Sequence, residues 1–193
     1  YLAQLGRHEL QISVRHDDNE QHGSYNTGSI GYGYSISDSL RASASAGTAF
    51  KAPTFNQLYH PTFGNPDISE ETSRSLELGL DGEQRWGSWA VALYRNEIDD
   101  LIAYFNQGGG LRAQNIDKAV INGVELSLAS QLLGWDLSSN LTLQDPANKS
   151  SRAGQGDLLP RRAEQIFNLD LVRRFGRIGL GASLHVEGRR WDN

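Results

Sequence analysis

Few residues of this chain have the types and spacing that chemistry needs. The acidic run His16-Asp17-Asp18-Asn19-Glu20 offers oxygen ligands of the kind that Ca²⁺ prefers. It lacks the Asp-x-Asp-x-Asn-Gly spacing of an EF-hand loop, and runs of loop carboxylates are usually solvated. We therefore interpret the run as an exposed acidic loop and assign no metal ligand.

Signatures of catalysis are also missing. The histidines at positions 8, 16, 22, 60 and 185 include no His-Glu-x-x-His pair, and the sequence has no Gly-x-Ser-x-Gly motif. His16, Asp17 and His22 form the one cluster that could serve a hydrolase, and no nucleophile accompanies them. Gly108-Gly109-Gly110 is followed by neither a helix nor a Lys-Ser/Thr pair, so it predicts no phosphate site. With no cysteine either, the sequence predicts no catalytic residue and no cofactor.

Charge and apolar content exclude two further classes of protein. The 18 Lys and Arg residues against 23 Asp and Glu residues give a net charge of −5, and the basic residues are scattered. Without a basic face, the chain is not expected to bind nucleic acid. The longest apolar stretch, Trp89–Tyr94, is too short for a transmembrane helix.

Alternation of apolar and small or polar residues runs through almost the whole sequence and predicts an all-β chain. For example, Leu76, Leu78 and Leu80 alternate with Ser75, Glu77 and Gly79. We expect nine strands, at Leu10–Val14, Ile30–Ile36, Leu40–Phe50, Leu76–Leu80, Trp89–Phe105, Val120–Leu128, Trp135–Leu143, Phe167–Leu171 and Ile178–Val186.

The links between these strands are long and short by turns. Ala52–Thr72 and Asp145–Pro160 are long, whereas Ser37-Asp38-Ser39 and Arg85-Trp86-Gly87 are short. An up-and-down meander with such links has every long loop at one end and every tight turn at the other. That layout is typical of an antiparallel transmembrane β-barrel with long external loops.

A soluble β-sandwich or lipocalin-like barrel is the competing interpretation, and three features weigh against it. Between their links the strands are typically ten residues or longer, as a bilayer crossing requires. The polar positions are rich in Gly, Ser, Ala and Asn, which suit the crowded inside of a barrel. Aromatic residues lie near the tight turns, where an interfacial girdle would be: Trp86, Trp89, Trp135 and Phe175.

Charged residues on or near the polar positions are interpreted as a hydrated inner wall. They are Glu77, Asp81, Arg95, Glu97, Glu125, Glu164, Asp170, Arg174 and Glu187.

Three segments resemble the TonB-dependent outer-membrane receptors, most closely their cobalamin (vitamin B12) branch. The first is Gly47–Tyr59 with Gly64-Asn65-Pro66, the second is Asn115–Glu125, and the third is Leu158–Ala163. After Gly64-Asn65-Pro66 the family usually has a second proline before its glutamate, which Asp67-Ile68-Ser69-Glu70-Glu71 lacks, so the loop here is expected to be less rigid. The residues that carry the family motif are Phe50, Lys51, Ala52, Pro53, Gly64, Asn65, Pro66, Asn115, Gly123 and Glu125.

The resemblance implies a fold and a location. Barrels of this family resemble a closed sheet of about 22 strands, so residues 1–193 would be a partial barrel domain that lacks the plug and the last strands. Alone, they would form an open curved sheet with two bare edges that neither inserts nor transports. The expected location is the bacterial outer membrane, with its lipid as a partner.

The resemblance also implies a function without bond chemistry: capture of cobalamin at external loops and its import with energy relayed by the TonB complex, which would act through segments absent here. By resemblance, Arg161 helps to contact the ligand, and its planar donors could grip an amide or a phosphate. Alternatively, Arg161 and Arg162 are charges at a strand end. A ferric-siderophore or haem receptor of the same family, an outer-membrane hydrolase and a passive porin remain as alternative functions.

Overall fold

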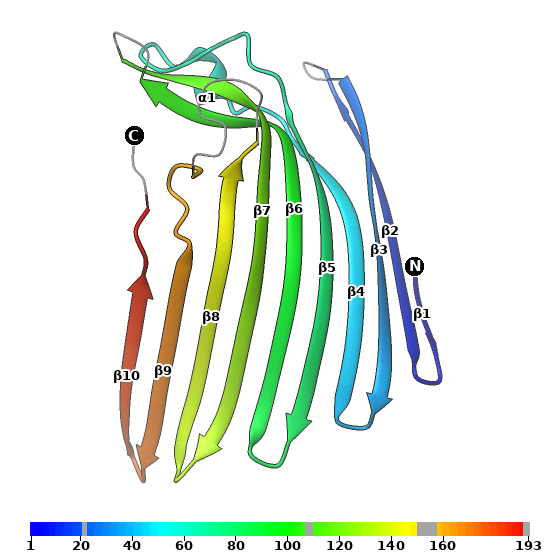
Figure 1. Cartoon of the computed structure of the whole chain (residues 1–193), viewed down its shortest axis with the longest axis vertical. Helices are drawn as coiled ribbons and strands as arrows, with labels where there is room; N and C mark the ends of the chain where they lie inside the picture. The colour runs from blue at the N-terminus through cyan, green and yellow to red at the C-terminus, as the bar shows by residue number, and fades with distance from the viewer. Residues whose placement is uncertain (21–22, 107–109, 150–157, 191–193) are drawn as a thin grey trace.

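The computed structural model describes residues 1–20, 23–106, 110–149 and 158–190. These residues form one antiparallel sheet of ten strands, each bonded to its neighbours in chain order, and a short helix (Figure 1). The elements are β1 (Leu2–Leu5), β2 (His8–Asn19), β3 (Gly23–Ser37), β4 (Leu40–Lys51), α1 (Phe55–Tyr59), β5 (Glu71–Gln84), β6 (Gly87–Asn106), β7 (Leu111–Leu132), β8 (Trp135–Asn148), β9 (Gln165–Phe175) and β10 (Ile178–Glu187). The all-β meander is confirmed: all nine expected strands are present, and β1 is an additional short one.

The links lie as the sequence predicted. In Figure 1 the tight turns gather at the lower end, and α1 lies with the long links at the upper end. Gly6 and Gly176, in two of the tight turns, have φ of 58° and 62°, a conformation that glycine adopts without strain. Within the described ranges, no helix has the length and apolar character needed to cross a membrane.

Apolar side chains form continuous rows across the strands on one face, here called the outward face. One row contains Leu10, Tyr32, Ala44, Leu78, Leu93, Val124 and Leu143. Leu78 is 52% exposed and Leu93 54%, although both lie in the middle of the sheet. An apolar surface of this extent is unfavourable in water but needs no cover in lipid. The outward face therefore fits a bilayer.

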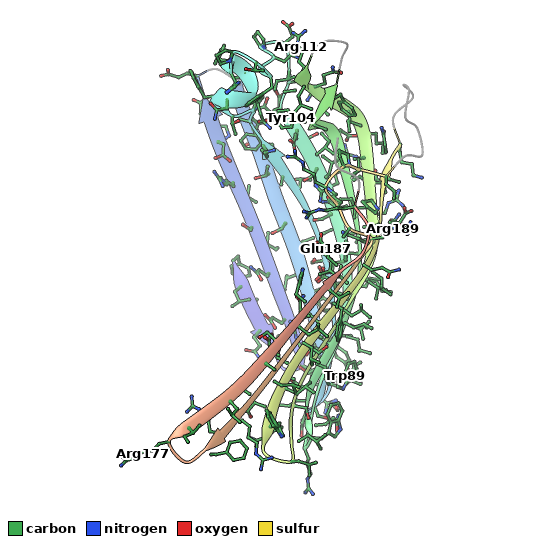
Figure 2. The ribbon with its side chains drawn as sticks, turned by 90° about the vertical axis from the view of Figure 1, so that its left-hand side faces the viewer. Trp89, Tyr104, Arg112, Arg177, Glu187 and Arg189 are labelled. Carbon is green, nitrogen blue, oxygen red and sulfur yellow. The ribbon has the colours of Figure 1, made fainter. Side chains whose placement is uncertain are left out.

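An aromatic belt lies at the tight-turn end of the outward face. The Arg173 guanidinium lies 4.6 Å from the centre of the Phe175 ring and 5.8 Å from that of Trp135. Figure 2 shows Trp89 toward the same end as Arg177 and far from Tyr104 and Arg112 at the other. These rings lie where an interfacial girdle would be.

The inner face of the curved sheet is polar and lined by small residues. Arg41 reaches across Gly33 to Glu9, at 3.0 Å, and lies 3.7 Å from Asp81. A Cβ at Gly33 would lie 2.5 Å from the Arg41 guanidinium, so a larger residue there would displace the guanidinium from its present path. A hollow of about 510 Å³ on this face is lined by residues that include Ser35, Arg41, Asp81, Ser88, Ser127 and Asn140.

Two of the charged residues assigned to the inner wall lie on the outward face instead. Arg95 and Glu97 occupy the same alternate positions of β6 as Val91 and Leu93. The row that runs through Ile12, Ile30, Ala46 and Leu76 continues into Arg95, Asn122 and Asp145. The outward face therefore changes from apolar to charged along one row of paired residues.

The β6–β7 hairpin extends beyond its neighbours and bends over the external end of the sheet (Figure 1). The bend coincides with Asp100, whose φ of 56° is uncommon for a residue other than glycine, while the pairing keeps one register from Asp99↔Lys118 to Leu101↔Ile116. Ile98 and Leu101, which flank this position, share one buried cluster.

Candidate functional site

The buried apolar residues of the protein gather around this hairpin extension. One cluster consists of Ile98, Leu101, Ala103, Ile116, Ala119, Ile121 and Leu159. A second consists of Leu58, Ile68, Ile102 and Ala113. Leu159, from the β8–β9 link, thus packs against one set of hairpin residues, while the β4–β5 link packs against another through Leu58 and Ile68. The hairpin extension is covered on both sides.

Residues 52–70, here called the clamp loop, are folded by local hydrogen bonds. Thr54 and Gln57 form a capping box at the start of α1: Thr54 Oγ1 accepts from Gln57 N at 3.2 Å, and Gln57 Oε1 accepts from Thr54 N at 2.8 Å. After α1 the chain turns back, and Asn65 N donates to the Gln57 carbonyl at 2.8 Å. A Cβ at Gly64 would lie 2.5 Å from His60 N and 2.6 Å from His60 O, so the turn requires glycine.

Asn65 joins the clamp loop to the tip of the hairpin. Its Nδ2 donates to the Ala113 carbonyl at 2.9 Å, and its Oδ1 accepts from the Arg112 guanidinium at 3.1 Å. The Ala113 amide in turn donates to the Phe63 carbonyl at 2.9 Å. Pro66, the next motif residue, is exposed.

Asn115, the first residue of the second motif segment, binds both the clamp loop and the neighbouring strand β6. Its Oδ1 accepts from Ser69 N at 2.9 Å, while its Nδ2 donates to Ser69 O at 3.1 Å and to Asp100 O at 2.6 Å. The first two motif segments therefore lie close together. The Asn65 side chain binds the backbone of Ala113, and the Asn115 side chain binds the backbone of Ser69 and Asp100.

The start of β5 carries a buried carboxylate that serves the same hairpin. Glu71, 8% exposed, lies 2.7 Å from Lys51 Nζ and also accepts from Ile102 N at 3.2 Å. Lys51 is the motif residue directly opposite Glu71 in the β4–β5 register. Ala52 and the buried Pro53 then begin the clamp loop.

Phe50 lies beside a tyrosine whose acidity is altered. The Phe50 and Tyr25 rings stack at 4.3 Å between centres. Tyr25 lies at the external end of β3, outside the apolar rows, and its hydroxyl donates to Glu70. This hydrogen bond, with burial and the negative charge of Glu70, raises the pKa of Tyr25 to about 12.

Gly123 and Gln144 anchor the third motif segment to the wall. The Tyr94 ring lies across Gly123, where a Cβ would be 2.7 Å from Tyr94 Cε1 and closer still to Cζ and Oη. Tyr94 Oη donates to Gln144 Oε1 at 3.0 Å, and Gln144 Nε2 donates to the Ala163 carbonyl at 2.8 Å. Glu125, two residues beyond Gly123, is exposed.

Arg161 and Arg162 lie at a pocket of about 200 Å³ between the hairpin and the third motif segment. Its lining is Leu101, Ile102, Ala103, Tyr104, Leu111, Leu159, Pro160, Arg161 and Arg162. Arg161 has φ of 60°, an uncommon conformation for a residue other than glycine. Leu159 is 1% exposed, and its amide donates to the Pro146 carbonyl at 2.8 Å. A pocket lined mainly by apolar residues and by two arginines suits an apolar ligand that carries amide or anionic groups.

The acidic run near the end of β2 is engaged in local contacts. Asp17 forms an ion pair with Arg15, Asp18 accepts from Ser24 Oγ at 2.9 Å, and His16 Nδ1 lies 2.8 Å from Asn26 Oδ1. In the ranges that the structure describes, no group of three His, Cys, Asp or Glu side chains is placed to hold a metal ion. His22, Gly108 and Gly109 lie outside those ranges.

Sequence reasoning missed Glu71, Tyr94 and Gln144. Glu71 could have been found by aligning the two strands, because it lies directly opposite Lys51. Tyr94 had a similar signal, since it lies opposite Gly123, a residue that leaves room for a ring. No sequence signal pointed to Gln144, because its contact with Ala163 forms only when the β8–β9 link folds back toward β8.

The sequence matches the family "TonB dependent receptor-like, beta-barrel" over residues 2–193. Three curated proteins named vitamin B12 transporter BtuB are similar to it. The protein of Photobacterium profundum is 42% identical over 137 residues, which cover 67% of this chain and 23% of that protein. Those of Vibrio vulnificus and Vibrio cholerae are 36% and 31% identical over 185 residues, covering 95% of this chain and 30% and 29% of those proteins. The chain thus spans less than a third of the length of these relatives.

Solved structures share the fold at lower identity. The ferric enterobactin receptor PfeA of Pseudomonas aeruginosa, as its Q482A mutant with enterobactin, has a TM-score of 0.78 at 22% identity, covering 96% of this chain and 31% of that one. The copper transporter OprC has a TM-score of 0.77 at 20% identity, covering 95% and 32%. The siderophore receptor PirA of the same Pseudomonas species has a TM-score of 0.74 at 23% identity, covering 95% and 35%. These identities support a common fold and nothing finer.

Proposed function

Because this chain belongs to the TonB-dependent receptor β-barrel family, we propose that it forms part of the wall of a transporter that binds cobalamin at its external end. The family consists of transporters of the bacterial outer membrane, so the chain is an outer-membrane segment and not an enzyme. Membership sets aside the hydrolase and porin alternatives. We take residues 1–193 as one continuous part of the barrel domain.

The observation that carries the choice of ligand is the set of cobalamin-transporter relatives. Three of them are 31–42% identical to this chain and cover two thirds of it or more. The siderophore and copper proteins named above are only 20–23% identical to it. Cobalamin is therefore favoured over a ferric siderophore.

The pocket of about 200 Å³ beside Arg161 is large enough for one side chain of this ligand and not for the whole molecule. Cobalamin is a large, partly apolar molecule with amide side chains and a phosphodiester, which are acceptors that a guanidinium can bind. In the proposed mechanism the ligand stabilises one arrangement of the external loops, and no bond is made or broken. Energy would reach the complete receptor from the TonB complex through segments outside this chain.

Equilibrium binding to the complete receptor in detergent tests the proposal. Cyanocobalamin should bind tightly and a ferric siderophore weakly. Arg161→Ala should weaken cyanocobalamin binding about ten- to a hundredfold, as expected for the loss of a hydrogen bond from a charged group. Arg177→Ala, at the tight-turn end, is the matched control and should leave the affinity unchanged (Figure 2).

The outcomes separate the alternatives. Siderophore binding without cobalamin binding would keep the family and reject the ligand. Equal cyanocobalamin affinity in the Arg161→Ala and wild-type receptors would remove Arg161 from the site. Binding of neither compound would leave haem or another cargo.

A further inference from the structure

We propose that Asn115 and Glu71 are positioning residues for the ligand, because they hold the β6–β7 hairpin that forms one wall of the Arg161 pocket. This inference rests on the proposed function for the identity of the ligand. Neither residue lines the pocket, so each would act on the ligand only through the hairpin.

The two walls of the pocket are supported differently. The wall that carries Arg161 is attached to β8 by the Leu159–Pro146 hydrogen bond and by an isolated bridge between Ala147 and Leu158. The opposite wall consists of Leu101, Ile102, Ala103, Tyr104 and Leu111, all from the hairpin extension.

The hairpin extension has no strand beside it among the described residues. The β5 register with β6 ends at Thr72↔Asp99, and the β8 register with β7 ends at Asn148↔Ala119. Beyond these pairs, the described residues of β6 and β7 have only each other as strand partners, from Leu101↔Ile116 to Asn106↔Leu111. A two-stranded ribbon is at best marginally stable in water. Its position therefore depends on contacts with the loops.

Asn115 and Glu71 supply polar contacts where the extension begins. Asn115 binds the carbonyl of Asp100 in β6 and both backbone groups of Ser69, with three hydrogen bonds. Glu71 accepts from the Ile102 amide and is neutralised by Lys51 at 2.7 Å. Both residues thus connect the rigid sheet or the clamp loop to the first residues of the ribbon.

Loss of either contact should lower the fraction of receptor in which the hairpin wall faces Arg161. The apparent dissociation constant of a ligand rises in proportion as the competent fraction falls. If Asn115→Ala reduces that fraction to about a tenth, the dissociation constant rises about tenfold. The Arg161 side chain itself is unchanged.

The experiment measures two quantities on the complete receptor in detergent: the dissociation constant of cyanocobalamin, and amide hydrogen exchange of the hairpin without and with ligand. Asn115→Ala should raise the dissociation constant about tenfold and speed exchange over residues 101–106 and 111–116, and saturating ligand should restore protection. Glu71→Gln keeps the size of the side chain and an acceptor for Ile102, so it is a milder second variant with smaller effects in the same direction.

Asn122→Ala is the matched control. Asn122 lies on β7 like Asn115, is exposed, and accepts from Arg95 at 3.3 Å on the outward face, away from the pocket. Its replacement should change neither the affinity nor the exchange of the hairpin.

Two results would overturn the inference. One is faster hairpin exchange with unchanged affinity in both variants, which would make the contacts purely structural. The other is unchanged exchange, which would mean that they do not hold the hairpin. If the wild-type receptor does not bind cyanocobalamin and binds a ferric siderophore, the proposed function fails. The affinities of the variants are then measured with the siderophore as the probe.

Discussion

Replacing Gly123 by alanine should destabilise the wall at its external end by about 2 kcal/mol. The added methyl group would lie 2.7 Å from Tyr94 Cε1, so the ring must move away from the strand. Overpacking of this kind costs about 1–3 kcal/mol, and loss of the 3.0 Å hydrogen bond from Tyr94 to Gln144 costs about 0.5–1.5 kcal/mol. The greater strand stability of alanine offsets about 0.5–1 kcal/mol of this.

Equilibrium unfolding of the complete receptor in urea, followed by tryptophan fluorescence, measures the change in the free energy of unfolding. Gly31→Ala is the matched control, because a Cβ there lies 3.9 Å from its nearest neighbour, Gln11 Cβ. It should leave stability unchanged or raise it by up to about 1 kcal/mol.

A double-mutant cycle isolates the cause. If the Tyr94 ring creates the cost, Gly123→Ala should be much less harmful in a Tyr94→Leu background, so that the two changes couple by about 1 kcal/mol or more. Additive effects, or a Gly123→Ala receptor as stable as Gly31→Ala, would refute the reasoning that the ring requires glycine beneath it.

Two further predictions concern the clamp loop and its neighbour. Gly64→Ala should detach the loop, because its methyl group would meet the His60 backbone at 2.5–2.6 Å; hydrogen exchange over residues 54–69 should rise, and unchanged protection would contradict the model of a tight turn. Tyr25 should ionise near pH 12, and Glu70→Gln should bring its pKa down toward 10, measured as the difference in 295 nm absorbance from Tyr25→Phe. Because the folded-state pKa is the higher one, the Tyr25 contribution to stability is complete below pH of about 10 and is lost as pH rises to about 12.

Much of the fold could be predicted because side chains alternate strictly across a strand and lipid selects apolar residues on one side. β1 was missed since its four residues, Leu2–Leu5, are too few for alternation to be recognised. The β6 run was expected to be regular as far as Phe105. Alternation alone does not locate a residue with an unusual backbone conformation, so the positive φ of Asp100 and the burial of Leu101 beside Ile98 were not foreseen.

The candidate site was predictable in its members but not in its contacts. Asn65 and Asn115 were singled out by resemblance, yet their partners Ala113 and Ser69 lie 48 and 46 residues away in the chain. Such pairs form only when the clamp loop folds back onto the hairpin, and no pattern in the local sequence predicts that contact. Arg95 was placed on the wrong face because its charge was given more weight than its alternation with Leu93.

The row of paired residues that begins at Ile12 and ends at Asp145 shows how the strands lean in the membrane. Counted from the first residue of each strand, Ile12 is four residues along β2 (12 − 8) and Asp145 is ten along β8 (145 − 135). If the strands were perpendicular to the membrane plane, paired residues would lie at the same depth in the membrane. With a lean of about 40° and about 4.8 Å between strands, six steps along a row climb about 18 Å, most of an apolar band about 25 Å tall. One row can therefore begin in the hydrocarbon layer at Ile12 and leave it at Arg95. On the outward face, the polarity of a residue depends on its depth in the membrane and not on the row to which it belongs.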